Sequence, residues 1–199
     1  MTPSELWVWL RRIRHCRGFG VQSPSAYAFI RYVVNEHYPY YAYAELKKAF
    51  PALPRQRRKL YELYMRLANH MQATHCHTNK DTGGAMESYV RAGCRHTSIT
   101  TLPLLTIDGA HQGHHKPHPT PLMAIVEANE QAAEWAPLYL AQAPEGSVLV
   151  VEGIGQTAEA KALWHKVQSS PASSVCFDLH YCGIAFKDKR YKQSYIVNF

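Results

Sequence analysis

Short apolar runs alternate with amphipathic segments through the second half of the sequence. The run at 147–151 is apolar and rich in β-branched residues, and Gly146 and Gly153 lie close to its two ends. Such a run predicts a short strand that is buried on both faces. Helices on both sides of a mostly parallel sheet provide that burial. We therefore expect an α/β fold built around this strand, with Glu152 at the end where such sheets bind ligands.

The remaining elements of the second half are expected on both sides of this strand. Further strand patterns occur at 73–77, 97–101, 122–126, 174–178 and 193–199. Helical patterns occur at 85–92, 130–143 and 158–167. No helical pattern separates the last two strands, so we predict that they form an antiparallel hairpin.

The first 71 residues carry helical patterns and no strand pattern. Helices are expected at 5–15, 24–36, 44–50 and 57–71. Ser23 and Pro24 form a typical helix start, with serine as the N-cap and proline in the first turn. We expect a helical segment at 1–71 that packs on an α/β domain at 72–199 to give one compact unit.

The stretch between the strands at 97–101 and 122–126 is polar and rich in His, Gly and Pro. A parallel crossover needs a dozen or more residues and usually contains a helix, but no helical pattern is found here. The sequence therefore predicts a sheet that is truncated in the middle. The strand at 97–101 would then be an exposed edge that something covers, and a second copy in a homodimer is one candidate.

The composition of the chain favours some classes of protein and argues against others. The formal net charge is +7, and much of it comes from basic clusters at 11–17 and 55–59. These clusters favour either a nucleic-acid partner or two solvated helix faces. The five scattered cysteines include no CxxC pair, which argues against a disulfide framework and a zinc ribbon. No apolar run reaches the length of a membrane span, so we expect a cytoplasmic protein with no membrane partner.

Two segments resemble a known family. One is Arg17-Gly-Phe-Gly-Val-Gln-Ser-Pro24, and the other is the run Asp178-Leu-His-Tyr-Cys-Gly-Ile-Ala-Phe186 with the closing Tyr195-Ile-Val-Asn-Phe199. Together with the order of elements, they resemble class I S-adenosylmethionine-dependent methyltransferases, and most closely a bacterial O-methyltransferase-like group. The resemblance implies a Rossmann-like fold in which the final strand runs antiparallel beside the central one. It also implies S-adenosylmethionine as cofactor.

The chain departs from this family where the cofactor binds. The family has an acidic-x-Gly-x-x-x-Gly loop after its first strand, because glycine lets the backbone approach the cofactor closely. With Gly84 as the last glycine, Thr78 takes the acidic position and Lys80 the first glycine position. The implied cofactor-binding residues are therefore Thr78, Lys80, Gly83 and Gly84. A lysine is too large for that place and has the same charge as the sulfonium. An alternative interpretation is that Lys80 and Asp81 cap the next helix.

A second departure lies at the end of the second strand. The family has an acid there that holds the ribose, whereas this chain has Leu102-Pro103. Two acids do remain, since Glu127 and Glu152 follow two strands where the metal-dependent branch of the family has ligands. The resemblance makes them the candidate catalytic residues and the candidate ligands of a divalent cation, which would orient and acidify a hydroxyl. Gly153 offers no third side chain.

Two other groups of residues have chemical potential. His111, His114, His115 and His118 lie within eight residues and could bind a transition metal, but their spacing matches no established motif. An exposed loop that picks up metal adventitiously is the favoured interpretation. Asp178 follows an apolar strand, and the alternatives there are a paired structural carboxylate and a general base.

Three functions are compatible with this sequence. The first is a degenerate methyltransferase-like protein without normal cofactor binding, which acts as a binding or interaction module for an unknown small molecule or protein. The second is an active O-methyltransferase on a small molecule, with a diverged cofactor site. The third is a basic nucleic-acid-binding protein, which the charge favours although no recognition motif is present.

Overall fold

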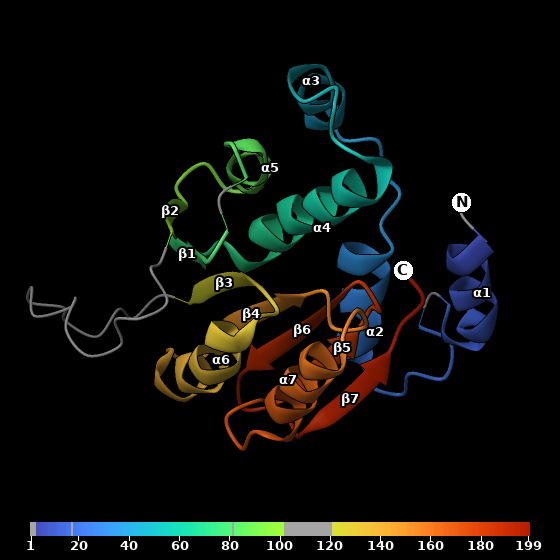
Figure 1. Ribbon diagram of the computed structural model, residues 1–199, viewed down its shortest axis with the longest axis vertical. Coiled ribbons are helices and arrows are strands. Elements are labelled where there is room, and N and C mark those ends of the chain that lie inside the picture. The colour runs from blue at the N-terminus through green and yellow to red at the C-terminus, as the bar shows by residue number, and fades with distance from the viewer. Residues whose placement is uncertain (1–2, 17, 81, 102–120) are drawn as a thin grey trace, which may run out of the picture.

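A mixed sheet with helices on both faces forms the centre of the molecule (Figure 1). The computed structural model describes residues 3–16, 18–80, 82–101 and 121–199. Within them the strand order is β2-β1-β3-β4-β6-β5-β7. The strands are β1 (His75–Thr78), β2 (Ser98–Thr101), β3 (Leu122–Glu127), β4 (Ser147–Glu152), β5 (Val175–Asp178), β6 (Cys182–Lys187) and β7 (Gln193–Ile196). Most neighbouring strands are parallel, and only β6 is antiparallel to its neighbours.

The helices follow the predicted order with shifted ends. They are α1 (Pro3–Arg11), α2 (Pro24–Phe29), α3 (Tyr41–Ala49), α4 (Arg55–Met71), α5 (Ala85–Gly93), α6 (Glu130–Gln142) and α7 (Ala158–Ser169), with a 3-10 turn η1 (Ile13–His15) and a π-helical turn η2 (Ile30–Val34). The predicted N-cap at Ser23 is confirmed, since its hydroxyl accepts from the Ala26 amide. The described part of the first 71 residues contains no strand, as predicted.

β4 is the central strand that the apolar run predicts. All six of its residues are buried. It pairs in parallel with β3, which places Glu127 beside Glu152, and antiparallel with β6 on its other side. The prediction of an α/β fold with a mostly parallel sheet is therefore confirmed.

The prediction of a C-terminal hairpin is wrong about which strands pair. The strands at 174–178 and 193–199 were expected to pair antiparallel, but β5 and β7 pair in parallel. The antiparallel hairpin forms between β5 and β6 instead. The reason is that Cys182–Lys187 is itself a strand, whose apolar residues are all buried. It is therefore β6, and not the final strand, that runs antiparallel beside β4.

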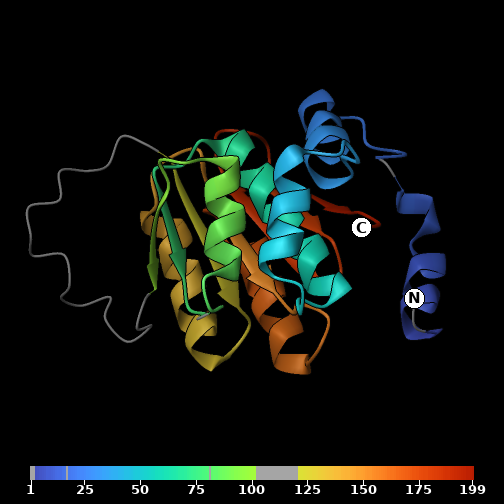
Figure 2. The same cartoon turned by 90° about the horizontal axis from the view of Figure 1, so that it is seen from above.

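Two apolar cores lie on the opposite faces of the sheet. One contains side chains of α2, α4 and α5, and the other contains side chains of α6 and α7. Figure 2 shows these two sets of helices on opposite sides of the strands. In β1, Cys76 and Thr78 are buried, whereas His75 and His77 are only half-buried. The alternation explains how such a polar sequence forms an inner strand.

β2 forms one edge of the sheet, and three of its four residues are exposed. This agrees with the predicted edge strand. The region that was predicted to be truncated lies outside the described residues, and so does the cluster His111, His114, His115 and His118. None of the helices in the described residues has the length and hydrophobicity needed to cross a bilayer.

Candidate functional site

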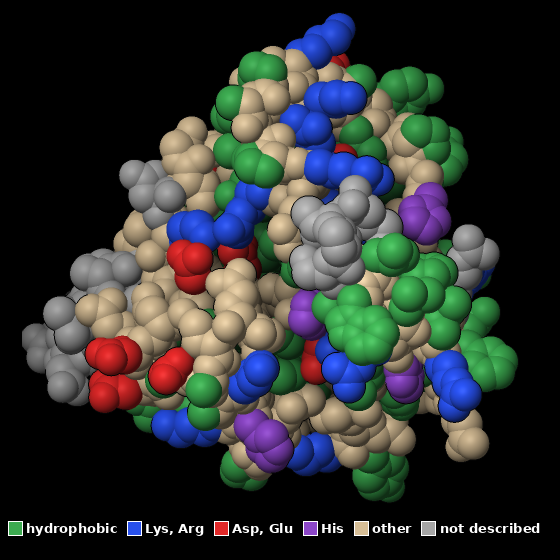
Figure 3. All heavy atoms as spheres, turned by 45° about the vertical axis from the view of Figure 1, so that its right-hand side comes forward, with side chains coloured by type: hydrophobic (Ala, Val, Ile, Leu, Met, Phe, Trp, Pro, Cys, Tyr) green, Lys and Arg blue, Asp and Glu red, His purple; other side chains and the backbone are tan. Residues whose placement is uncertain are grey.

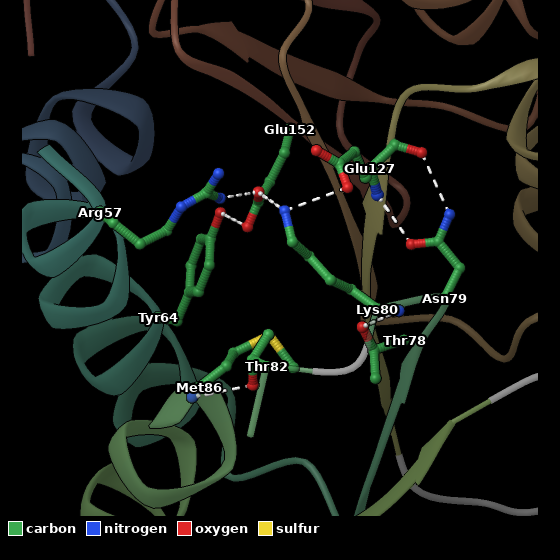
Figure 4. Close-up of polar contacts among 9 residues, drawn as sticks. All are labelled: Arg57, Tyr64, Thr78, Asn79, Lys80, Thr82, Met86, Glu127 and Glu152. Atoms are coloured by element: carbon green, nitrogen blue, oxygen red, sulfur yellow. Dashed lines mark hydrogen bonds and ion pairs between the residues drawn. The ribbon is translucent and has the colours of Figure 1, made fainter. Parts of the chain in front are cut away.

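Polar side chains gather at the carboxyl ends of β1, β3 and β4 (Figure 4). Glu127 and Glu152 are the last residues of β3 and β4, and they are paired in register. Lys80 follows the end of β1, which is parallel to β3. Because these strands are parallel, their ends meet at one edge of the sheet, where open α/β sheets bind ligands.

The carboxylate of Glu152 is the buried centre of this site. Its side chain is only 4% exposed. It accepts a hydrogen bond from Arg57 and another from the Tyr64 hydroxyl at 2.9 Å, both from α4. The Lys80 ammonium lies 3.4 Å from the same carboxylate. A buried carboxylate is costly unless paired, and here two cations and a hydroxyl satisfy it.

The protonation of Tyr64 follows from this environment. Burial, together with the negative charge of Glu152, raises the pKa of the Tyr64 phenol well above its ordinary value. Tyr64 therefore stays protonated and donates to Glu152. Burial acts to lower the pKa of Arg57, but the charge of Glu152, its hydrogen bond to Arg57 and the nearby Tyr61 and Tyr64 together outweigh burial and raise that pKa. Both groups are thus fixed as donors, which suits a structural network better than proton transfer.

Lys80 joins the two carboxylates. Its Nζ lies 3.0 Å from Oε2 of Glu127 and 3.4 Å from Oε2 of Glu152. The side chain of Glu127 is 49% exposed, so its pair is screened by water and contributes less. The Lys80 amide donates to the Thr78 hydroxyl at 3.2 Å, which holds the backbone in a local turn.

Asn79 ties the end of β1 to the end of β3. Its side-chain oxygen accepts from the Glu127 amide at 2.8 Å, and its side-chain amide donates to the Glu127 carbonyl at 3.1 Å. Asn79, Arg57 and Tyr64 were not predicted as site residues, although Arg57 belongs to the basic cluster at 55–59. A signal for the last two was their spacing of seven residues on a helix, which places them on the same face.

A small cavity opens beside this network. Its volume is about 200 Å³. That is below the roughly 300–1,000 Å³ that is typical of ligand pockets. The residues that line it are Pro54, Gln56, Arg57, Leu60, Glu127, Glu152, Gly153, Gln156 and Tyr181. Its size and lining suit a small polar molecule better than a nucleoside-sized one.

The residues of the predicted cofactor loop make contacts with other parts of the protein and not with the cavity. Thr78 is fully buried, and Lys80 is held in ion pairs. Gly83 and Gly84 have left-handed backbone angles, with φ of +60° and +79°, which favour glycine. None of these four residues is among those that line the cavity. The predicted residues Glu127 and Glu152 do line it.

The alternative of a capping role for Lys80 is not supported, because another residue fills that role. The Thr82 hydroxyl accepts from the Met86 amide at 3.1 Å in the first turn of α5, and it donates to Glu87 at 2.8 Å. Asp81 lies outside the described residues. The Lys80 side chain thus points toward the carboxylates. Gly84 is the N-cap residue of α5, and the Thr82 hydroxyl satisfies one amide of its first turn.

The residues at the site do not fit the divalent cation that the resemblance implies. The ammonium of Lys80 already bridges both candidate carboxylates. Gly153 follows Glu152 and has no side chain to offer. Among the described residues no group of three or more His, Cys, Asp or Glu side chains is arranged to hold a metal ion.

Asp178 is a paired carboxylate, as one of the two alternatives predicted. Its Oδ1 lies 2.8 Å from the Arg12 guanidinium and also accepts from the His180 amide at 2.8 Å. These contacts tie the N-terminal segment to the end of β5. They give Asp178 a structural role.

The sequence matches no protein-family model and no curated protein sequence. The methyltransferase resemblance therefore rests on the motifs and on the arrangement described above.

Proposed function

We propose that this chain is a degenerate member of the class I S-adenosylmethionine-dependent methyltransferase superfamily that has lost normal cofactor binding and acts as a binding or interaction module. One feature of the strand order supports the superfamily, because an antiparallel strand lies beside the central β4, although it is β6 and not the final strand. A shared fold does not establish a shared activity, so the function has to be argued from the site. As a module of this kind, the protein would act in the cytoplasm.

One observation carries this proposal: Lys80 bridges Glu127 and Glu152 at the ends of β3 and β4. In the family the equivalent loop position is a glycine, and the cofactor brings its own positive charge. Here the protein supplies the positive charge from its own chain. A cationic sulfonium would meet both Lys80 and Arg57 at this place, and like charges repel.

Calorimetric titration of S-adenosylmethionine and S-adenosylhomocysteine into the purified protein, with and without Mg²⁺, tests the proposal. We expect no binding heat up to millimolar ligand. Binding with a micromolar Kd would overturn the proposal and would mean that the loop at 78–84 holds the cofactor in another way. The uncharged thioether of S-adenosylhomocysteine serves as a control, because it separates repulsion of the sulfonium from a general loss of the binding site.

The second candidate is an active O-methyltransferase with a diverged cofactor site. The observation that favours it is that Glu127 and Glu152 lie side by side and both line the cavity. Glu127→Ala distinguishes the two candidates, because Glu127 is half-exposed and its loss is expected to leave the fold intact. An enzyme would lose turnover in this variant. A binding module would show no methyl transfer in either form.

A further inference from the structure

The N-terminal segment, made up of α1, η1 and the turn that follows, exposes several large apolar side chains. Trp7 is 61% exposed and Phe19 is 80% exposed. The other members of this surface are between 40% and 48% exposed, and they are Leu6, Trp9, Leu10 and Ile13. We call these six side chains the α1 surface. A large contiguous apolar patch on a protein surface commonly marks a site of interaction with a protein or a membrane.

Polar contacts attach this helix to the domain, and none of its described side chains belongs to the two apolar cores. On its inner side, Arg12 pairs with Asp178, and Val8, one turn earlier, is half-buried. Asn198 adds two contacts, since its side-chain amide donates to the Trp9 carbonyl at 3.3 Å and its backbone amide donates to the His15 carbonyl at 3.0 Å. The helix is therefore held with its apolar side chains turned outward.

Basic side chains border the α1 surface. Arg11 and Arg14 are both exposed, and the guanidinium of Arg11 lies 5.8 Å from the centre of the Trp7 ring. The sequence from 6 to 35 contains no Asp or Glu. Figure 3 looks at the side of the molecule where α1 lies and shows hydrophobic side chains gathered there with basic ones at their edge. The surface is therefore complementary to something both apolar and anionic.

This combination distinguishes between the candidate partners. A second copy of the chain would bring the exposed arginines of both molecules together, which is unfavourable. RNA would use the arginines and aromatic rings, but it offers nothing apolar to Leu6, Leu10 and Ile13. A bilayer surface with anionic headgroups can bind the arginine, aromatic and aliphatic side chains at once. Tryptophan in particular favours the boundary between headgroups and acyl chains.

We propose that the α1 surface binds peripherally to membranes that contain anionic lipids. The leucine and isoleucine side chains enter the acyl boundary, and Arg11 and Arg14 contact the headgroups. With nine residues, α1 is far too short to span a bilayer, so the helix lies on the membrane. The expectation of no membrane partner rested on the lack of a span, which this surface does not need.

Vesicle sedimentation tests the proposal with phosphatidylcholine vesicles and with vesicles of phosphatidylcholine mixed with phosphatidylglycerol. We expect the protein to sediment with the anionic vesicles and to stay in solution with the neutral ones. Tryptophan emission gives an independent readout, since Trp135 and Trp164 are buried and only Trp7 and Trp9 are exposed. Binding should shift this emission to shorter wavelength. A protein that stays in solution with both kinds of vesicle overturns the proposal.

Matched variants locate the binding surface. Leu6→Ser together with Leu10→Ser should lower vesicle affinity at least about tenfold, because each leucine loses its apolar burial. The variant Tyr41→Ser with Tyr191→Ser removes two side chains that are more than 90% exposed elsewhere, and it should bind as the wild type does. Arg11→Gln with Arg14→Gln should weaken binding to anionic vesicles and reduce its dependence on salt.

Two outcomes would replace the membrane with another partner. Salt-sensitive RNA binding that survives the leucine changes, in the absence of vesicle binding, would assign the basic residues to nucleic acid. A dimer in light scattering that the leucine changes convert to a monomer would assign the α1 surface to a second copy. Either result overturns the proposal.

Discussion

The two sides of the sheet, meaning the two ends of its strand order and not its two faces, differ in how they are held together. On the side that runs from β3 to β7, every strand except the edge strand β7 is largely buried, and helices cover both faces. On the side of β1 and β2, half of β1 is only partly buried and β2 is largely exposed. No residue of β1 or β2 belongs to the core that α6 and α7 form among the described residues.

This difference separates what maintains the fold from what would perform chemistry. The apolar side specifies the strand order through burial, which needs no particular functional group. The polar side is where the resemblance places a cofactor, and it is held by side chains such as Asn79 and Lys80. A chain can therefore keep its fold on one side while it exchanges a ligand for internal contacts on the other.

The largest effect is expected for Glu152, where the two sides meet. Glu152→Ala leaves Arg57, Tyr64 and Lys80 without their shared acceptor in a buried place. Removing one partner of a buried pair costs about 3–5 kcal/mol, so we expect a loss of stability of about 3 kcal/mol in chemical denaturation. Glu127→Ala is the control and should cost less than about 1 kcal/mol because Glu127 is half-exposed. Equal losses for the two variants would mean that Glu152 is not the centre of the network.

The next effect tests the packing of the apolar side. A Cβ atom on Gly183 of β6 would lie 2.5 Å from the ring of Trp164 on α7. Gly183→Ala should therefore destabilise the protein by about 2 kcal/mol through overpacking. Adding Trp164→Leu should recover part of this loss, as thermal unfolding of the three variants would show. If the second substitution recovers no stability, the contact between β6 and α7 does not cause the destabilisation.

A smaller effect is expected from the polar connection between β1 and β3. Asn79→Ala removes two hydrogen bonds to the backbone of Glu127 and should cost about 1 kcal/mol. Hydrogen exchange should show the Glu127 amide less protected in the variant. Amides in the middle of β4 should be unchanged, since packing protects them. Loss of protection in both places would mean that the two sides do not behave separately.

The smallest effect expected is a loss of stability at acidic pH that arises from His180. Burial, together with the charge of Arg12, lowers the pKa of His180 in the turn between β5 and β6. The unfolded chain therefore binds a proton more readily, at its ordinary pKa of about 6.5. The stability that His180 contributes is present above that pH and is lost as the pH falls through the lower pKa of the folded state.

His180→Asn tests this, because asparagine tolerates the left-handed backbone angle of +72° at this position. Denaturation at several pH values between neutral and mildly acidic should give a flatter dependence for the variant. An unchanged slope would assign the acid sensitivity to other groups, such as His70, whose pKa burial also lowers.

The apolar side was predictable from sequence, but not completely. β4 was found because its residues form a continuous buried run. β6 was missed because its apolar residues were interpreted as part of a family motif between the two strands of the predicted hairpin. The partner of a terminal strand also depends on the whole sheet. The parallel pairing of β5 and β7 is a long-range choice that local patterns do not contain.

The sequence was sufficient to predict the two acidic residues of the site, but not the side chains that pair with them. Glu127 and Glu152 were found because they end predicted strands. Arg57 and Tyr64 reach Glu152 from positions 95 and 88 residues earlier in the chain, so no local pattern connects them. Lys80 stood out as a misfit in the cofactor loop, but its role as a bridge depends on the packing of β1 beside β3.

The protein's own Lys80 bridges the two carboxylates at the strand ends where a cofactor would bind. A double-mutant cycle with Lys80→Met and Glu152→Gln measures this coupling in the free energy of unfolding. The control cycle uses Lys189 and Glu145, an ion pair at 3.5 Å whose side chains are 83% and 62% exposed. We predict a coupling of about 1–2 kcal/mol for the first pair and about 0.5 kcal/mol or less for the control. Equal couplings in the two cycles would mean that Lys80 is a solvated side chain and that the strand ends are open to a ligand.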